Sequence, residues 1–240
     1  MNSKNKAVIL FITIILLVII FYPQGFERFL SLLVSRKSNT ISRTPLYIYF
    51  FQHLQMVIIS SLIAIVVGVT LGIFITTEKG EVYKDILLKL VNLGQAFPSP
   101  AILALMVPVL GYGLKGALIA LVIYAFMPIV YNTVIGIEEV SRDVVEAARG
   151  MGMNNYMIYR KIKIPLASKV ILGGIRTSTV INISAATLAA AVGAGGLGVP
   201  LVNGVRTFDM ILILQGAIPV TLLAIITELS IKNIEHRFDV

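Results

Sequence analysis

The chain has 240 residues, of which 57% are hydrophobic and only 13% are charged. A soluble domain carries nearly twice that share of charge, so the composition excludes an ordinary soluble protein and indicates a single membrane domain. The net charge of +8 does not indicate nucleic-acid binding, because the basic residues flank apolar segments and form no surface with interleaved aromatic side chains. The absence of cysteine excludes disulfides and thiolate metal ligands.

Charge-free windows locate the expected membrane spans, because a spanning helix needs about 20 apolar residues. The windows are 7–26, 44–77, 90–114, 116–137, 177–205 and 210–227. We therefore expect an all-α integral membrane protein with about six transmembrane helices and both termini on the cytoplasmic side. This topology places residues 141–165 in a cytoplasmic loop between the fourth and fifth helices.

Residues 1–45 are predicted to form a membrane anchor helix and an external basic segment. Lys4 and Lys6 precede an apolar run, as in a signal peptide, but no small-residue cleavage site follows it, so we expect a retained anchor. The segment 25–43 has more basic than acidic residues, which breaks the positive-inside trend on the outer side. Its apolar residues have roughly helical spacing, which is typical of an interfacial amphipathic helix. These are Phe26, Phe29, Leu30 and Leu33.

The second window contains a small-residue pattern and a histidine, and each has a structural and a functional interpretation. Gly68 and Gly72 form a small-residue pattern that lets helices pack closely, for which a dimer contact is the less favoured interpretation. His53 is the only ionisable residue in any window, and we expect it at the membrane interface near the outer end. A metal site is not expected, because the other histidine, His236, lies in the C-terminal tail.

Prolines and polar residues interrupt the later windows. Pro98, Pro100, Pro108 and Pro128 indicate kinked or broken helices with freed backbone carbonyls. Polar side chains in a span should face other helices or a water-filled path, and hydrogen bonding between helices is the simpler interpretation of each. The candidate translocation-pathway residues are Gln95, Ser99, Asn132, Thr133, Asn182 and Thr187.

The loop 141–165 is the longest well-charged segment of the chain, and it is mostly basic. Ser141 is expected to cap a first helix, which Gly150 and Gly152 would end because glycine tolerates the left-handed conformation of a C-terminal cap. Asn154 or Asn155 would cap a second helix that runs through Ile162. Pro165 cannot continue that helix but suits the first turn of the next one. The loop is therefore predicted to be a capped helical knob with a small-residue face at Ala147, Ala148 and Gly152.

The end of the fifth window, residues 193–198, matches the GxGxxG dinucleotide-binding pattern. The context argues against a nucleotide site, because an apolar span precedes the motif, Val199-Pro200 follows it, and no βαβ unit is expected. We predict a glycine-rich turn at the outer side. The chain also lacks the GxxxxGK[ST] loop that binds ATP.

The spacing within the loop resembles the EAA loop of permease subunits in bacterial ABC importers. That pattern is EAA, three residues, G, nine residues, I, one residue and LP. It is matched here by Glu146, Ala147, Ala148, Gly152, Ile162 and Pro165, with Ile164 in place of leucine. From about Gln52 to Ile231 the chain resembles permeases of osmoprotectant importers, which handle glycine betaine, choline, carnitine and similar quaternary amines. The stretches that carry this resemblance are 93–113, 127–153 and 173–198.

The resemblance implies a MetI-like type I importer permease in the bacterial cytoplasmic membrane, with a core at residues 46–232 and a cytoplasmic tail at 233–240. Its implied partners are a second permease subunit, an extracellular or periplasmic substrate-binding protein and cytoplasmic ATPase subunits that dock on the EAA loop. ATP and Mg would bind to the ATPase, so the chain itself would hold no cofactor, no metal and no catalytic residue. The chain contains no Trp, so an aromatic cage for a quaternary amine is not expected in it.

Three alternatives stay open at this point. An ABC importer for another small solute, such as an amino acid, would share the EAA loop. An ion-coupled secondary transporter would usually need inverted repeats or intramembrane carboxylates, and no Asp or Glu lies in the six windows. An intramembrane enzyme is disfavoured because the chain has no HExxH motif, no GxSxG motif and no paired acids within the spans.

Overall fold

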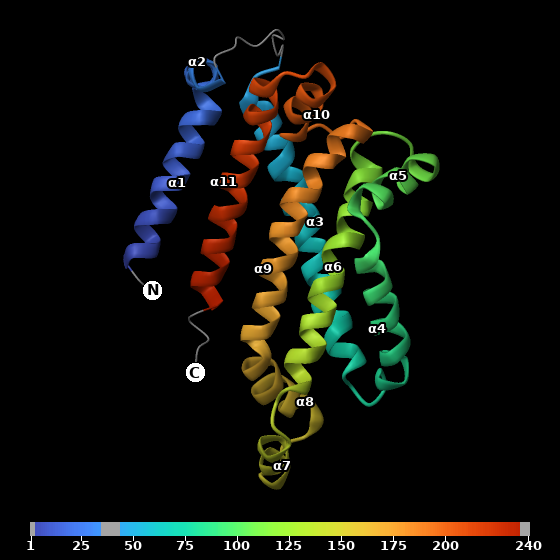
Figure 1. The fold of residues 1–240 in the computed structure, drawn as a ribbon. Helices are drawn as coiled ribbons and strands as arrows, with labels where there is room; N and C mark the ends of the chain where they lie inside the picture. Colours follow the sequence, from blue (N-terminus) through green and yellow to red (C-terminus); the bar gives the residue numbers. More distant parts are fainter. Residues whose placement is uncertain (1–2, 35–43, 236–240) are drawn as a thin grey trace.

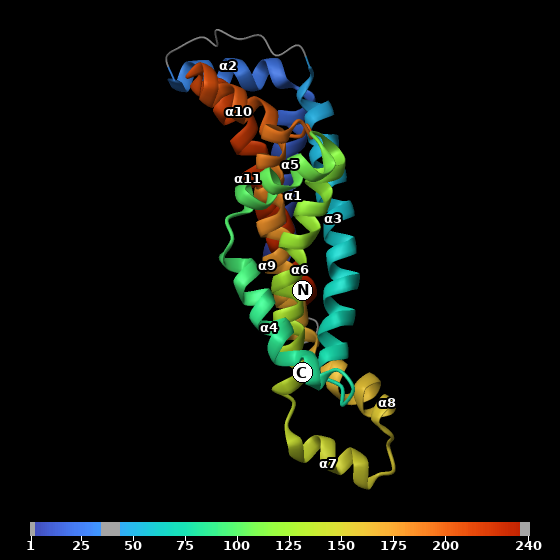
Figure 2. The same ribbon diagram turned by 90° about the vertical axis from the view of Figure 1, so that its right-hand side faces the viewer.

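The computed structural model describes residues 3–34 and 44–235, which form a bundle of long helices with shorter ones at both ends (Figures 1 and 2). The first elements are α1 (Ser3–Phe21), α2 (Pro23–Val34), α3 (Leu46–Ile75), α4 (Glu81–Ala96), α5 (Ser99–Leu110) and α6 (Leu114–Glu138). They are followed by α7 (Arg142–Gly150), α8 (Asn155–Ile158), the π-helical turn η1 (Tyr159–Lys163), α9 (Ile164–Leu188), the 3₁₀ turn η2 (Ala189–Val192), α10 (Gly198–Thr207) and α11 (Met210–Glu235).

The long helices confirm the expected membrane class. Within the described ranges, four continuous helical stretches are long and apolar enough to cross a membrane, and two bent helix pairs raise the number to six if each pair counts as one span. The windows 44–77, 116–137 and 210–227 correspond to α3, α6 and α11. The first window ends in a sharp bend, since α1 and α2 meet at 99°.

The window 90–114 is not one straight span. It covers the end of α4 and all of α5, which are bent by 98° at residues 97 and 98. The sequence explains the bend, because a residue before proline avoids the helical region and Phe97 has an extended backbone with ψ of 129°. Pro98 is also extended and immediately precedes α5, so the expected proline break is confirmed here.

The predicted fifth span, 177–205, is wrong at both ends. The helix begins far earlier, and helical backbone runs from Asn155 to Val192, while α10 is a separate helix after the glycine-rich turn. A charge-free window could not include Arg176. In the structure this side chain forms ion pairs with Glu228 and Glu235 of α11, at 3.4 and 3.5 Å. The pairing lowers the cost of placing the charge on a long apolar helix.

The centre of the bundle is formed by α3, α6 and α9 (Figure 1). The close approach of α3 to α6 depends on the two glycines of the small-residue pattern. A Cβ atom on Gly68 would lie 2.9 Å from the Ile129 Cβ, and one on Gly72 would lie 2.6 Å from the Thr133 Cβ. The pattern therefore packs two helices within this chain, as small residues do in membrane proteins.

Gly72→Ala is expected to lower the apparent melting temperature of the detergent-solubilised protein. The added methyl group would meet the Thr133 side chain and, at 3.2 Å, the Val130 carbonyl oxygen, and overpacking of this kind typically costs about 1–3 kcal/mol. Gly173→Ala on α9 is the matched control, because its Cβ would have no neighbour within 4 Å. Equal melting temperatures for the two variants would contradict the packing role of Gly72.

The N-terminal helices lie beside α11. α1 packs along α11, and α2 lies at the end of the bundle opposite α7 and α8 (Figure 2). Phe26 and Leu30 are buried, whereas Phe29 and Leu33 are exposed. A helix is present here, as predicted, with two of its four apolar residues packed on the bundle, and its place at the membrane interface stays a prediction. The basic residues Arg36, Lys37 and Arg43 of the predicted external segment lie outside the described residues.

Candidate functional site: the coupling loop

The predicted coupling loop projects from one end of the bundle, with α7 farthest from the core (Figure 2). Its first helix, α7, contains good helix formers. It carries Asp143 in the first turn and Arg149 in the last turn, where each charge interacts favourably with the helix dipole. The two-helix arrangement agrees with the sequence-based expectation.

The first helix ends in a Schellman motif. Gly152 has a φ of +81°, the Gly152 N–H donates to the Arg149 carbonyl at 2.9 Å, and the Met153 N–H donates to the Ala148 carbonyl at 3.1 Å. These two bonds are the signature of that cap, and glycine is the residue that adopts its left-handed position at little cost. Gly150 is the last helical residue and does not have positive φ. Gly152 alone therefore turns the chain.

The two predicted N-terminal caps have different outcomes. Asn154 caps α8, because its Oδ1 accepts the Met157 N–H at 2.9 Å. Ser141 occupies the N-cap position of α7 with a non-helical backbone, but its side chain makes no capping hydrogen bond. The expected side-chain cap at Ser141 is thus wrong.

Pro165 lies in the first turn of the next helix, as predicted, but the expected break between the second helix and that helix is wrong. The backbone passes from α8 through η1 into α9, where Pro165 lies in the first turn. Proline removes a backbone donor and clashes with the carbonyl one turn earlier in a regular helix. In η1 the Ile164 N–H donates to the Tyr159 carbonyl, five residues back. This wider turn lies directly before the proline and fits its missing donor.

The EAA-loop positions differ in exposure. Glu146, Ala147, Gly152 and Pro165 are exposed and Ile162 is half-buried, whereas Ala148 is only 1% exposed. The exposed small residues leave the outer surface of α7 open to a close contact. Ala148 is instead buried, so it does not belong to the open small-residue face that the sequence predicts.

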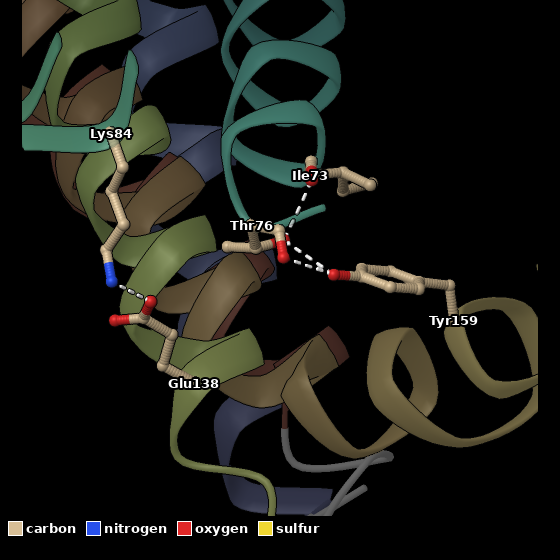
Figure 3. A network of polar contacts seen from close by, with 5 residues as sticks. All are labelled: Ile73, Thr76, Lys84, Glu138 and Tyr159. Carbon is tan, nitrogen blue, oxygen red and sulfur yellow. Dashed lines mark hydrogen bonds and ion pairs between the residues drawn. The ribbon is translucent and has the colours of Figure 1, made fainter. Parts of the chain in front are cut away.

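Polar contacts fix the loop to the core. The Tyr159 hydroxyl donates to the Thr76 carbonyl at the end of α3 (Figure 3), and the Asn155 side chain donates to Glu78 at 3.0 Å. On the other side of the same end, Lys84 of α4 forms an ion pair with Glu138, the last residue of α6 (Figure 3). The knob is therefore tied to α3 and the turn after it.

Asn182 holds α9 against α3. Its side chain is fully buried and donates to the Ser60 hydroxyl at 2.7 Å and to the Ser61 hydroxyl at 2.9 Å, while its Oδ1 has no hydrogen-bond partner. Ser60 in turn donates to the Met56 carbonyl at 2.7 Å. Inter-helix hydrogen bonding, the simpler interpretation of this residue, is thus present.

The other candidate pathway residues lie in different places. Thr133 is buried and donates to the Ile129 carbonyl at 2.7 Å, and the half-buried Asn132 donates to the Pro128 carbonyl at 2.8 Å. Gln95 is exposed on the last turn of α4, and Ser99 and Thr187 are half-buried. The structure does not gather these side chains into one site within the chain.

His53 is buried between helices near the N-terminal end of α3, and its place at the membrane interface stays a prediction. The side chain is fully buried, and its Nε2 lies 3.1 Å from the Ile183 carbonyl of α9. The neighbouring Gln52 accepts the Gly196 N–H at 3.0 Å, so α3 also supports the glycine-rich turn. Gly193, Gly195 and Gly196 all have positive φ, which agrees with the predicted turn. Sequence reasoning missed the His53 contact because its partner is a backbone atom 130 residues away.

Comparison with known proteins decides the family. The family described as "Binding-protein-dependent transport system inner membrane component" matches residues 68–240. The chain belongs to this family. It is therefore a permease subunit, a multi-pass protein of the inner membrane.

Curated relatives and solved structures agree with this assignment. The carnitine transport permease protein OpuCB of Listeria monocytogenes is 41% identical over 192 residues, 80% of this chain and 87% of its own length. The glycine betaine/carnitine/choline transport system permease protein OpuCB of Bacillus subtilis is 39% identical over 78% of this chain and 85% of its own. The inward-facing MetNI methionine ABC transporter shares the fold, with a TM-score of 0.70 and 20% identity over 79% of this chain and 94% of the matched chain.

Proposed function

We propose that this permease forms, with a second permease subunit, the membrane pathway of an ABC importer for a quaternary-amine osmoprotectant such as glycine betaine, carnitine or choline. A separate ATPase subunit would dock on α7 and bind ATP and Mg, and an external binding protein would deliver the solute. The permease itself would perform no chemistry and hold no cofactor.

The observation that carries the coupling role is the geometry of α7. The helix stands apart from the bundle, shows Glu146 and Ala147 to solvent and is tied by η1 to the core. A rigid contact of this kind lets a movement of the docked ATPase reach the membrane helices. ATP binding at the partner would then shift the equilibrium of the whole assembly between two states.

The solute class rests on relatives rather than on a pocket in this chain. Several curated relatives at 37–41% identity are permeases of carnitine, choline or glycine betaine systems. With no Trp in the chain, the binding protein is the better place for the aromatic cage that recognises a quaternary ammonium. An importer for another small solute is the alternative, because the solved amino acid and methionine transporters share the fold.

Uptake into vesicles tests the proposal. Vesicles that hold the permease with its co-purifying partners should accumulate labelled glycine betaine, choline or carnitine when ATP and the binding protein are both present. Omission of either should reduce accumulation to the level of empty vesicles. If none of the three solutes accumulates although an ATPase co-purifies through α7, the solute class is wrong and the permease assignment stands.

A further inference from the structure

A pocket of about 680 Å³ lies between the coupling loop and the C-terminal end of α3. It is closed on one side by the last turn of α3 and the turn after it, and on the other by α7, α8 and η1. The Tyr159–Thr76 and Asn155–Glu78 hydrogen bonds join these two sides. Figure 3 shows Tyr159 reaching across to Thr76. The pocket volume falls in the range of about 300–1,000 Å³ that small-molecule sites usually occupy.

The walls of the pocket are mostly apolar. Ile73 and Phe74 contribute from the last turn of a membrane-spanning helix, and Ile158 and Ile164 contribute from the loop side. The loop is proposed to be cytoplasmic, so the end of α3 would place the pocket at the level of the cytoplasmic membrane surface. A ligand with an apolar part can therefore reach it from the bilayer.

The remaining lining is rich in cations. The pocket lining contains four basic residues but only two carboxylates, those of Glu78 and Glu81. The basic residues are Lys79, Arg149, Arg160 and Lys163. None of the four forms an ion pair with a carboxylate among the residues that the structure describes. Arg160 donates to the Tyr156 hydroxyl at 3.3 Å, and Lys163 lies 4.7 Å from the centre of the Tyr159 ring.

We propose that this pocket binds the headgroup of an anionic phospholipid. Arg and Lys side chains recognise a phosphate through charge-assisted hydrogen bonds, and basic pockets on the cytoplasmic side of membrane helices bind anionic lipid headgroups. The apolar wall at Ile73 and Phe74 would receive the start of the acyl chains. A soluble phosphate would leave that wall uncovered, which favours a lipid as the source of the anion.

The pocket and the surface proposed to bind the ATPase both involve α7, but they use different residues of it. Val145 and Arg149 of α7 line the pocket, whereas Glu146 and Ala147 do not. A bound headgroup would bridge Lys79, on the turn after α3, and Arg149 or Arg160 of the loop. It would thereby reinforce the two hydrogen bonds that hold the loop to the core.

Native mass spectrometry of the full-length chain in neutral detergent tests this proposal, with phosphatidylglycerol added and phosphatidylcholine of the same acyl chains for comparison. The wild-type protein should retain phosphatidylglycerol several-fold more than phosphatidylcholine. The double variant Lys79→Gln/Arg160→Gln should lose most of that preference. The control Arg142→Gln/Lys89→Gln removes the same charge from exposed residues outside the pocket and should behave as wild type.

Several outcomes would overturn the proposal. Equal retention of the two lipids would show apolar binding alone, and an equal loss in the control variant would show that net charge, not the pocket, determines binding. Displacement of phosphatidylglycerol by glycerol phosphate would identify a soluble anion as the ligand. Unchanged lipid retention with loss of ATPase co-purification would make the pocket a protein contact. If the double variant does not elute as folded protein, Lys79→Gln alone, on the exposed turn, decides between these results.

Discussion

Gly152→Val is expected to abolish ATP-driven uptake while the permease stays in the membrane at its normal level. Gly152 holds the left-handed position of the Schellman motif, with a φ of +81°. A non-glycine residue costs roughly 1–2 kcal/mol in this conformation, and a β-branched residue is a rare outlier there. Relief of the strain would change the direction of the chain after α7. Glu146 and Ala147 would then no longer face the ATPase as they do in the native loop.

Because the space around Gly152 is open, the predicted effect comes from its backbone conformation and not from a side-chain clash. A Cβ atom at Gly152 would have no neighbour within 4 Å, and the same holds at Gly150, two residues earlier. Gly150 lacks the positive φ, so Gly152→Ala and Gly150→Ala differ chiefly in backbone conformation. Uptake should fall in the first variant and persist in the second. Normal uptake by Gly152→Val at normal expression would refute the coupling role of the turn.

The coupling loop could be predicted from the sequence because its causes are local. Asn154 caps the helix that follows it, and Gly152 ends the helix before it, each through hydrogen bonds to residues within a few positions. The sequence predicts Pro165 in the first turn of a helix, but it does not predict the unbroken passage from α8 through η1 into α9. A π-helical turn has no simple sequence pattern, and it satisfies the proline by shifting one bond to the carbonyl five residues back.

The spans could be predicted wherever the residues themselves are apolar. The limit is reached at Arg176, whose charge is balanced by Glu228 and Glu235 on another helix. A charge-free window treats such a residue as the end of a span, because the pairing appears only after the helices have packed. The same limit explains why the predicted window 210–227 stops before Glu228 and Glu235, although both residues lie inside α11.

Long-range polar contacts could not be predicted at all. The partners of Asn182 are more than 120 residues away, and the partner of His53 is a backbone carbonyl on α9. The residue types show only that a partner is needed, because polar groups in a membrane must be satisfied. For the same reason the pocket beside η1 has no signal in the sequence, since its two sides come from segments about 80 residues apart.

Gly198→Ala is expected to have the largest effect on folding. The glycine-rich stretch matches a nucleotide-binding pattern, but its glycines are needed for structural reasons. Within this stretch, a Cβ atom would meet the most severe clash at Gly198. A Cβ atom there would lie 1.8 Å from the Thr187 carbonyl oxygen and 2.6 Å from its carbon. Both are backbone atoms, so no side-chain rotation relieves the clash. The start of α10 would have to move away from the end of α9.

The cost of this displacement should reach or exceed about 3 kcal/mol, the upper end for overpacked sites. We expect little folded protein in size-exclusion chromatography and a much lower apparent melting temperature for what remains. Gly173→Ala makes the same chemical change on α9 in open space, and it should keep or raise the melting temperature, since alanine favours helix by about 1 kcal/mol. If Gly198→Ala has the same apparent melting temperature as Gly173→Ala, α10 does not pack against α9 as closely as the structure shows.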